Sequence, residues 1–257
     1  MSVERVAERS IFGVPIADVS MRDALEICRS TLASAPERAR SIFFVNASTL
    51  NLAYEDPAYR SVLAESDWVF GDGTGVRWAV RFLHGARLLD NVNGTDLAPA
   101  LLGRGLGLRY YLLGASADAI ERAAAHARAA FPGWQLVGHH HGYVAIDACD
   151  AVVDKINASR PHLLLVGMGN PKQELWIHAQ RARLAVPLCI GIGGLLDYWA
   201  GDLARAPAWV RRLGFEWVHL LLAQPRKFRR YVFGNPLFLA RISCGCSSGS
   251  PSWSSQA

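Results

Sequence analysis

The segment Leu163–Glu174 reads LLLVGMGNPKQE and decides the expected fold. Its first four residues, Leu163–Val166, are an uninterrupted apolar run, which is typical of a strand buried on both faces. A glycine-rich turn follows, and Pro171 stands near the first position of a helix, where a missing N–H costs nothing. Strand, tight turn and helix in this order form the repeating unit of a parallel α/β sheet.

The same unit recurs along the chain. Strands are predicted at Ser41–Asn46, Trp68–Gly71, Leu108–Leu113, Gln135–Val137, Leu163–Val166 and Val186–Ile190. Helices are predicted at Met21–Leu32, Leu50–Glu65, Thr95–Leu102, Ala117–Phe131, Cys149–Ala158 and Lys172–Ala182. This alternation predicts an α/β fold with a doubly wound, mainly parallel sheet. Ligands of such sheets bind beyond the carboxyl ends of the strands, so the residues after each strand are the functional candidates.

Composition agrees with a globular protein. The 257 residues are 51% hydrophobic and 19% charged, which excludes wholesale disorder. The N-terminal segment carries charges, and no apolar stretch is long enough to span a bilayer, so we expect a soluble cytoplasmic protein. The five cysteines lack metal-site or disulfide spacing, and we expect them to be small buried apolar residues.

The net charge of +5 is concentrated near the C-terminus. Eight basic residues and one acid, Glu216, lie within residues 205–241, and the rest of the chain has a slight excess of acids. A local cluster of this kind indicates an anionic partner for one segment. Aromatic residues (Trp209, Trp217, Phe228 and Tyr231) alternate with these bases. From Ser243 onward the sequence is rich in serine and is expected to be a disordered tail.

Polar residues follow two of the predicted strands. Asn46 precedes Ser48 and Thr49, either of which is an expected helix cap, while the Asn46 amide is a possible ligand contact. Asp72 stands between glycines after Trp68–Gly71. It either caps the next helix or serves as a general base, a metal ligand or a hydroxyl-binding group. The glycine spacing around Asp72 is not that of a dinucleotide-binding loop.

Three further loops can each be interpreted either as an ordinary structural feature or as part of a ligand site. Thr95 or Asp96 is the expected cap of the helix that follows them, and the turn at Gly114 is either a phosphate site or an ordinary strand-to-helix connection. After Leu163–Val166, the turn that precedes Gln173 suits a diphosphate, a sugar or a uracil edge. The adjacent histidines, residues 139–141, cannot all point at one ion from an extended chain, so a solvated turn is the preferred interpretation.

Taken together, these elements resemble the WecG/TagA/CpsF family of bacterial glycosyltransferases, glycosyltransferase family 26, over roughly residues 10–232. The resemblance rests on motifs in a fixed order: Val45-Asn46, Gly71–Gly75, Asn93–Leu97, Tyr111–Gly114, Gly138–Tyr143, Gly167–Glu174, Gly193-Gly194 with Asp197, Gly201, Arg205–Pro207, Gly214–Trp217 and Pro225–Tyr231. Phe44 and Ser48-Thr49 depart from residues that some members carry.

This resemblance implies a Rossmann-like enzyme that transfers a sugar from a UDP donor to a polyprenyl-diphosphate-linked acceptor, with inversion and without a required metal or other cofactor. Asp72 is then the general base. The implied donor-binding residues are Asn46, Thr74, Asp96, Gly114, Gly169, Gln173 and Asp197, with the backbone amides of Gly114 and Gly169 facing the diphosphate. The donor sugar stays open between N-acetylmannosamine-like and glucose-like, and the product is expected in exopolysaccharide or cell-wall glycan.

The resemblance also gives the basic segment a role. We expect a glycosyltransferase domain over residues 1–203, a basic helical appendage over residues 204–241 and a disordered tail over residues 242–257. The arginines expected to bind the acceptor and an anionic membrane, at the inner face of the plasma membrane, are Arg205, Arg211, Arg212, Arg226, Arg229 and Arg230.

Other functional classes remain as alternatives. A non-catalytic UDP-binding or regulatory module would use the same loops. Nucleic-acid binding by the arginines is disfavoured because no recognition motif is present, and a nicotinamide dehydrogenase is disfavoured because the dinucleotide-binding loop is missing. The possibility of a homo-oligomer stays open.

Overall fold

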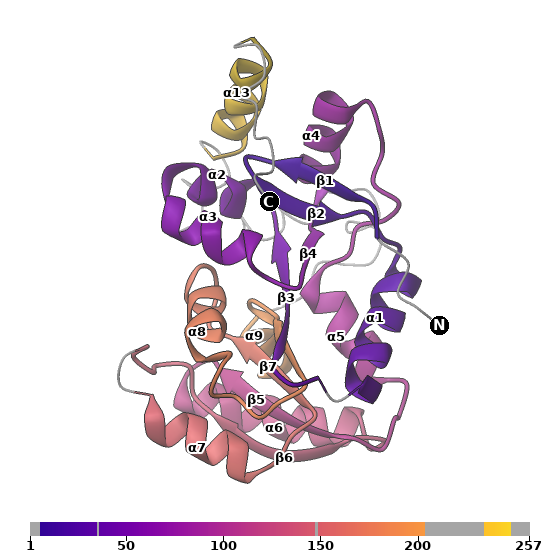
Figure 1. The fold of residues 1–257 in the computed structure, drawn as a ribbon. Coiled ribbons are helices and arrows are strands. Elements are labelled where there is room, and N and C mark those ends of the chain that lie inside the picture. Colours follow the sequence, from indigo (N-terminus) through magenta and orange to yellow (C-terminus); the bar gives the residue numbers. More distant parts are fainter. Residues whose placement is uncertain (1–5, 35, 147–148, 204–233, 248–257) are drawn as a thin grey trace.

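A computed structural model describes residues 6–34, 36–146, 149–203 and 234–247. Its centre is one eight-stranded sheet in the order β1-β2-β4-β3-β8-β7-β5-β6 (Figure 1). β1 pairs antiparallel with β2, and every other neighbouring pair is parallel. The strands are β1 (Glu8–Ile11), β2 (Val14–Ala17), β3 (Arg40–Val45), β4 (Trp68–Gly71), β5 (Arg109–Gly114), β6 (Gln135–His140), β7 (Leu163–Gly167) and β8 (Leu188–Gly191).

Helices cover both faces of this sheet. They are α1 (Met21–Ser34), α2 (Ala47–Glu55), α3 (Pro57–Ala64), α4 (Thr74–His84), α5 (Gly94–Leu102), α6 (Ala117–Ala130), α7 (Asp150–Ala158), α8 (Lys172–Gln180), α9 (Leu195–Trp199) and α13 (Gly234–Ser247). The prediction of a Rossmann-like, mainly parallel α/β sheet is confirmed.

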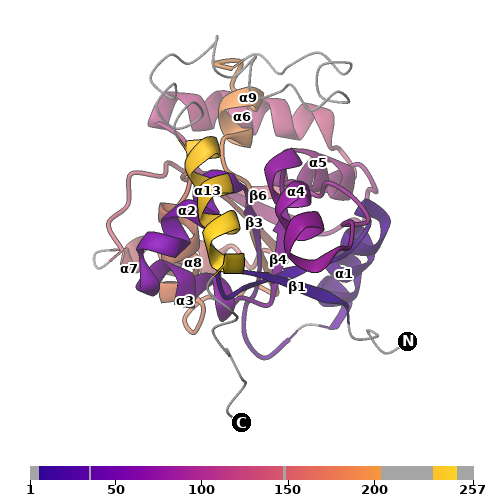
Figure 2. The ribbon, with the colours of Figure 1, turned by 90° about the horizontal axis from the view of Figure 1, so that it is seen from above.

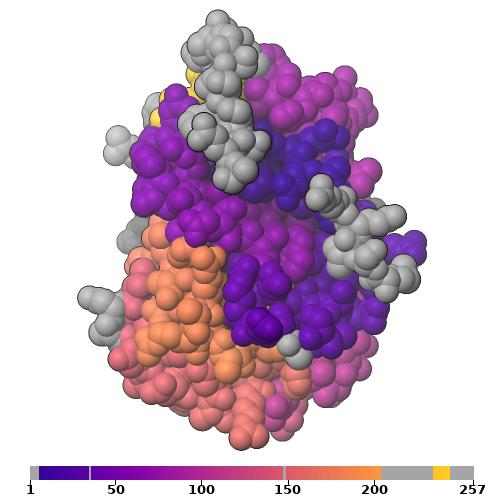
Figure 3. Space-filling model, in the orientation of Figure 1, coloured from indigo at the N-terminus to yellow at the C-terminus, as the bar shows by residue number. Residues whose placement is uncertain are grey.

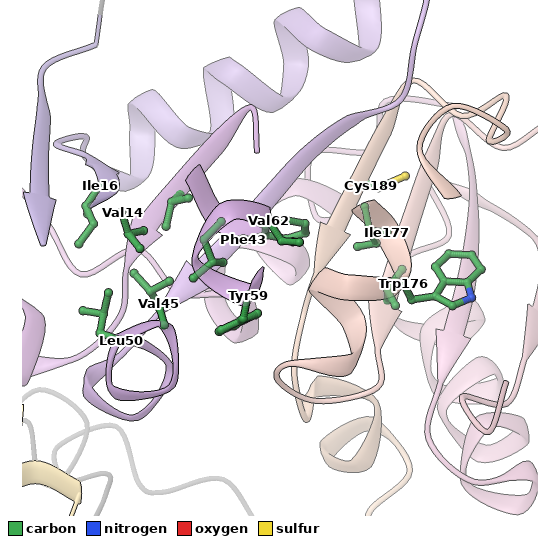
Figure 4. Close-up of a cluster of buried hydrophobic side chains, with 14 of the residues drawn as sticks. Val14, Ile16, Phe43, Val45, Leu50, Tyr59, Val62, Trp176, Ile177 and Cys189 are labelled. Carbon is green, nitrogen blue, oxygen red and sulfur yellow. The ribbon is translucent and has the colours of Figure 1, made fainter. Parts of the chain in front are cut away.

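The core consists of two hydrophobic layers, one on each face of the sheet. In β3, Phe43 packs into one layer, while Ile42 and Phe44 pack into the other. In β7, Leu164 and Leu165 divide in the same way. Successive side chains of a strand point to opposite faces, so a strand buried on both sides must be apolar throughout. Figure 4 shows part of the first layer, where strand residues meet side chains from α2, α3 and α8.

Two features of the fold differ from the sequence-based expectation. The β1–β2 hairpin was not predicted; its turn residues Phe12 and Gly13 both have positive φ, as in the tight turns that suit two-residue hairpins. The expected helix Leu50–Glu65 is two helices. Asp56 separates them because its side chain accepts from the N–H groups of Ala58 and Tyr59 and so caps α3.

The C-terminal helix α13 packs against α2 and α4 (Figure 2). Asn51 in α2 donates from Nδ2 to the carbonyl of Gly234 at 2.7 Å, and Phe238 is buried in the first core layer. Because α13 continues to Ser247, the boundary expected at residue 242 for a disordered tail is too early. Most of the expected appendage, residues 204–233, lies outside the described residues.

Cys28, Cys149 and Cys189 are buried free thiols, as predicted for them. Burial raises the pKa of Cys28 and of Cys189 to about 12, so neither forms a thiolate at neutral pH.

Candidate active site

The loops after the parallel strands meet at one edge of the sheet. Hydrogen bonds continue the strand pairing into these loops: the N–H of Asp72 donates to Val45 at 2.8 Å, and that of Ile192 donates to Val166 at 2.8 Å. On the other side of β7, the N–H of Ala115 donates to Gly167 at 3.1 Å. The loops are therefore tied to neighbouring strand ends, which fixes their positions relative to one another.

Asp72 follows the last residue of β4 and is half-buried. The N-cap position of α4 belongs to Gly73, which has no side chain, so Asp72 does not occupy the capping position considered from the sequence. Gly73 has φ of 90°, and its N–H donates to Oδ1 of Asn91 at 2.5 Å. The backbone at Asp72 is thus held on both sides, by Val45 and by Asn91.

Asn46 occupies the equivalent position after β3. Its Oδ1 accepts from the N–H groups of Ser48 and Thr49, while the Thr49 hydroxyl accepts from the N–H of Asn46 at 2.6 Å. This arrangement is a reciprocal capping box. The expectation that Ser48 or Thr49 caps α2 is wrong, because Asn46 itself is the cap.

The loop before α5 is organised by Asn93, which is buried. Its Oδ1 accepts from the hydroxyl of Thr95 and from the N–H of Asp96, and its Nδ2 donates to Oδ2 of Asp96 at 2.8 Å. The cap expected at Thr95 or Asp96 is therefore Asn93. A Cβ on Gly94 would lie 3.0 Å from the ring of Phe44 in β3, so this loop sits directly against the strand that leads to Asn46.

Glycines let the loops beyond β5, β6 and β7 touch. A Cβ on Gly114 would lie 2.3 Å from the carbonyl oxygen of Gly167, and one on Gly142 would lie 2.9 Å from the Cα of Gly114. Gly114 also has φ of 151°. Residues with side chains do not fit at these positions, so the three loops approach one another through their backbones.

A buried polar cluster supports the start of α8. Gln173 accepts from the N–H of Gly193 at 3.0 Å and donates to Oε1 of Glu174 at 2.7 Å. Oε1 of Glu174 also accepts from Asn170, and Oε2 accepts from the Tyr59 hydroxyl at 3.3 Å. Burial raises the pKa of Glu174 to about 7.

Gln173, predicted from the sequence as a donor-binding residue, belongs to this buried cluster. Its side chain is 1% exposed, and its oxygen and nitrogen both bond within the protein. Sequence reasoning did not single out Glu174, Asn170 and Tyr59 as partners. One feature of the sequence could have indicated that Glu174 is buried. This acid stands three positions after Pro171, in the first turn of a helix whose next residues are apolar.

The remaining predicted donor residues lie at the same edge. Thr74 is the first residue of α4 and is exposed, and Asp197 lies in the short helix α9. Gly169 has φ of 77°, and open space surrounds the position of its absent Cβ. Seven of the predicted residues lie at a strand end or in a segment leading from one, namely Asn46, Asp72, Thr74, Gly114, Gly169, Gln173 and Asp197. Asp96 lies in α5, which follows α4 rather than a strand, and the neighbouring Gly94 packs against Phe44 of β3 and Ile192 after β8.

The six arginines predicted to bind the acceptor and the membrane, Arg205, Arg211, Arg212, Arg226, Arg229 and Arg230, lie outside the described residues. His139 and His140 belong to β6, and Nε2 of His139 lies 2.8 Å from Glu121. In the part of the chain that the structure describes, no group of three or more His, Cys, Asp or Glu side chains is placed to hold a metal ion.

Comparison with known proteins assigns the chain to an enzyme class. The model of the glycosyl transferase WecG/TagA/CpsF family matches residues 9–247, which include every loop described above. The chain belongs to this family. This glycosyltransferase is 32% identical, over 182 residues, to the N-acetylglucosaminyldiphosphoundecaprenol N-acetyl-beta-D-mannosaminyltransferase of Bacillus spizizenii. The aligned region covers 70% of each chain.

Membership of this family confirms the resemblance seen in the sequence and makes the chain an enzyme of polysaccharide or cell-wall glycan synthesis. Within the described residues, none of the helices combines the length and the apolar character needed to cross a bilayer.

Proposed function

We propose that this glycosyltransferase moves a sugar from a UDP-sugar to a hydroxyl of a polyprenyl-diphosphate-linked sugar, with inversion at the anomeric carbon. The observation that carries the proposal is the position of Asp72, a half-buried acid at the end of β4 whose backbone is held by Val45 and Asn91. A carboxylate fixed at the ligand-binding edge is suited to general-base catalysis.

In the proposed reaction, the acceptor hydroxyl attacks the anomeric carbon of the donor. Its proton passes to the Asp72 carboxylate as the new carbon–oxygen bond forms. The bond from the anomeric carbon to the UDP phosphate breaks, and UDP leaves with the electron pair. Attack opposite the leaving group inverts the anomeric configuration, and no covalent sugar–enzyme intermediate is needed.

The donor is proposed to lie across the glycine-lined loops. Open space surrounds the position of the absent Cβ of Gly169, which leaves room for a diphosphate close to the main chain, where amide groups bind anions. The backbone amide of Gly114, at a strand end packed against Gly167, is the second proposed diphosphate contact. Asn46, Thr74, Asp96 and Asp197 are the proposed polar contacts of the nucleotide and sugar. Gln173 contributes through Gly193, because its amide oxygen fixes the loop after β8.

The activity of the Bacillus spizizenii relative, as given by its name, supplies the proposed substrates. That protein transfers N-acetylmannosamine to N-acetylglucosaminyl-diphospho-undecaprenol, as its name states. We propose the same acceptor class here, reached by peripheral association with the cytoplasmic face of the membrane. The donor sugar is the property that the experiment must determine.

The test is a panel of UDP-sugars, offered with a short-chain prenyl-diphospho-N-acetylglucosamine and read by product mass. We expect one sugar to be added from one donor, with the opposite anomeric configuration, and turnover to be unaffected by EDTA. Binding of UDP without transfer from any donor would instead support a non-catalytic nucleotide-binding module.

A further inference from the structure

The outer face of α4 combines exposed aromatic and basic side chains. Trp78 is 68% exposed and Phe82 is 59% exposed, and the two lie one helical turn apart. Arg77 and Arg81 are exposed beside them. The opposite face of the helix, with Val76 and Val80, is buried in the first core layer. The helix is therefore anchored in the protein while its aromatic face points outward.

The charged side chains of residues 73–89 are all basic. Residues 73–89 contain Arg77, Arg81 and Arg87 together with His84, and no Asp or Glu. An exposed helix with arginines next to aromatic side chains is suited to the boundary between phospholipid headgroups and acyl chains. Trp is especially favourable there, because its ring is apolar while its N–H is polar. An anionic surface is the partner that these charges complement.

The neighbouring helix α13 also carries exposed apolar side chains. α13 packs against α4, and both helices lie at the same end of the molecule in two perpendicular views (Figures 1 and 2). Leu237 and Leu239 of α13 are 43% and 44% exposed. In the space-filling view, α4 stands at the outside of this end of the molecule (Figure 3). α4 and α13 thus present apolar side chains at one end of the protein.

The exposed face of α4 lies close to the candidate active site. Asp72 lies two residues before the start of α4, and Trp78 lies six residues beyond Asp72. At 1.5 Å per helical residue, Trp78 is roughly 6 Å along the helix from Thr74, its first residue. A bilayer that held Trp78 and Phe82 at its surface would bring diphosphate headgroups close to the Asp72 loop.

From these observations we propose that α4 is a membrane-contact helix that rests on anionic phospholipid through Trp78, Phe82, Arg77 and Arg81. Its benefit to catalysis rests on the proposed function, because it presents the site to a lipid-linked acceptor. The contact itself requires no substrate. It can therefore be tested whether or not the sugar-transfer proposal holds.

The experiment measures binding of the full chain to vesicles made of equal parts phosphatidylcholine and phosphatidylglycerol, compared with phosphatidylcholine alone. Two double variants remove the contact: Trp78→Ser with Phe82→Ser, and Arg77→Gln with Arg81→Gln. All four side chains are exposed, so folding is expected to survive. We expect each pair to weaken binding to the anionic vesicles by about tenfold or more.

The matched control is Arg104→Gln with Arg128→Gln, which removes the same charge from exposed positions at the α5–α6 end of the molecule. We expect this pair to bind as the parent does. Equal loss in the control would overturn the proposal, because the effect would then be one of overall charge. The proposal would also be overturned if the α4 variants bound the anionic vesicles as the parent does. A change in the oligomeric state of these variants with unchanged vesicle binding would likewise overturn it, because a second copy of the chain would then cover this face.

A second readout locates the contact. Lipids brominated near the headgroup quench the fluorescence of tryptophan side chains that reach them. The variant Trp78→Phe retains an aromatic side chain at this position but removes the fluorescent indole of Trp78. We expect quenching of the parent to exceed quenching of Trp78→Phe; identical quenching would contradict the proposal. Donor binding and transfer to a water-soluble acceptor should persist in the α4 variants, which separates a failed membrane contact from a failed proposed function.

Discussion

The side-chain oxygen of Gln173 accepts a hydrogen bond from the backbone N–H of Gly193 at 3.0 Å, which joins the first turn of α8 to the loop after β8. Gln173 also donates to Glu174, so this one amide connects a buried acid to Gly193, whose φ is 57°. The contact fixes the start of α8 and the loop after β8 relative to each other.

Replacing Gln173 by Met keeps the volume of the side chain but removes both of these hydrogen bonds. We expect the free energy of unfolding to fall by about 1–3 kcal/mol, because buried polar partners are left unpaired. UDP affinity should fall as well, since the Gly193 loop loses its anchor. Urea unfolding and calorimetric titration with UDP measure the two effects. A large loss of UDP affinity at unchanged stability would instead mean that Gln173 contacts the nucleotide directly.

Glu174 predicts a pH dependence of stability. Burial raises its pKa from 4.5 to about 7, so the folded state holds this proton to higher pH than the unfolded state does. The protonated Glu174 carboxyl therefore favours the folded state. Its contribution to the free energy of unfolding is fully present below the pKa of Glu174 in the unfolded state and is lost as the pH rises through its pKa in the folded state. Between roughly pH 5 and pH 8, we expect the parent to lose about 3 kcal/mol relative to Glu174→Gln, which cannot ionise.

Denaturant unfolding of both proteins at several pH values tests this expectation. Glu37→Gln, the same chemical change at an exposed position, is the control and should follow the parent. Parallel stability curves for the parent and Glu174→Gln would contradict the assignment of a raised pKa.

The close contact between Gly114 and Gly167 predicts that one added methyl group strongly destabilises the protein. Gly114→Ala would place Cβ 2.3 Å from the carbonyl oxygen of Gly167, and the three nearest atoms all belong to the Gly167 backbone, which cannot move aside as a flexible side chain can. We expect a loss of about 3 kcal/mol or more in the free energy of unfolding. Gly194→Ala is the control at the same edge, because the nearest atom to its new Cβ is 3.7 Å away. Similar melting temperatures for the two variants would show that the contact is not rigid.

The docking of α13 depends on Arg241. Its guanidinium donates to Glu55 and to the carbonyl of Asn51, and it lies 4.6 Å from the ring centroid of Tyr54. Arg241→Ala should cost about 1–2 kcal/mol, through the partly buried hydrogen bonds and the cation–π contact. Arg29→Ala, which removes an exposed pair with Glu26, should cost much less, because solvent screens that pair. Equal losses in thermal unfolding would mean that α13 is not held by this residue.

The sequence predicts the central strands because their patterns are unambiguous. Leu163–Val166 is apolar at every position, which a strand between two helix layers requires. The β1–β2 hairpin was missed because its strands are four residues long and contain Pro15. The break between α2 and α3 was missed because the periodic apolar pattern continues across Asp56 and Pro57.

Caps and buried polar contacts are harder to predict than strands. Several residues that can act as caps follow β3, and the choice of Asn46 over Ser48 depends on where the strand ends to within one or two residues. The burial of Glu174 cannot be inferred locally, because its partner Tyr59 lies 115 positions away in the sequence. Residues fixed by such distant contacts need the folded structure to be recognised.

The measurement that tests the central claim most directly is the turnover of Asp72→Asn with a UDP-sugar and a prenyl-diphosphate acceptor, alongside UDP binding and thermal unfolding. We predict a fall in kcat of at least about 100-fold, with UDP affinity and melting temperature near those of the parent, because the amide cannot accept the proton of the acceptor hydroxyl. Asp154→Asn, at an exposed position on α7, should behave as the parent. Near-normal turnover in a folded Asp72→Asn enzyme would contradict the assignment of Asp72 as the general base.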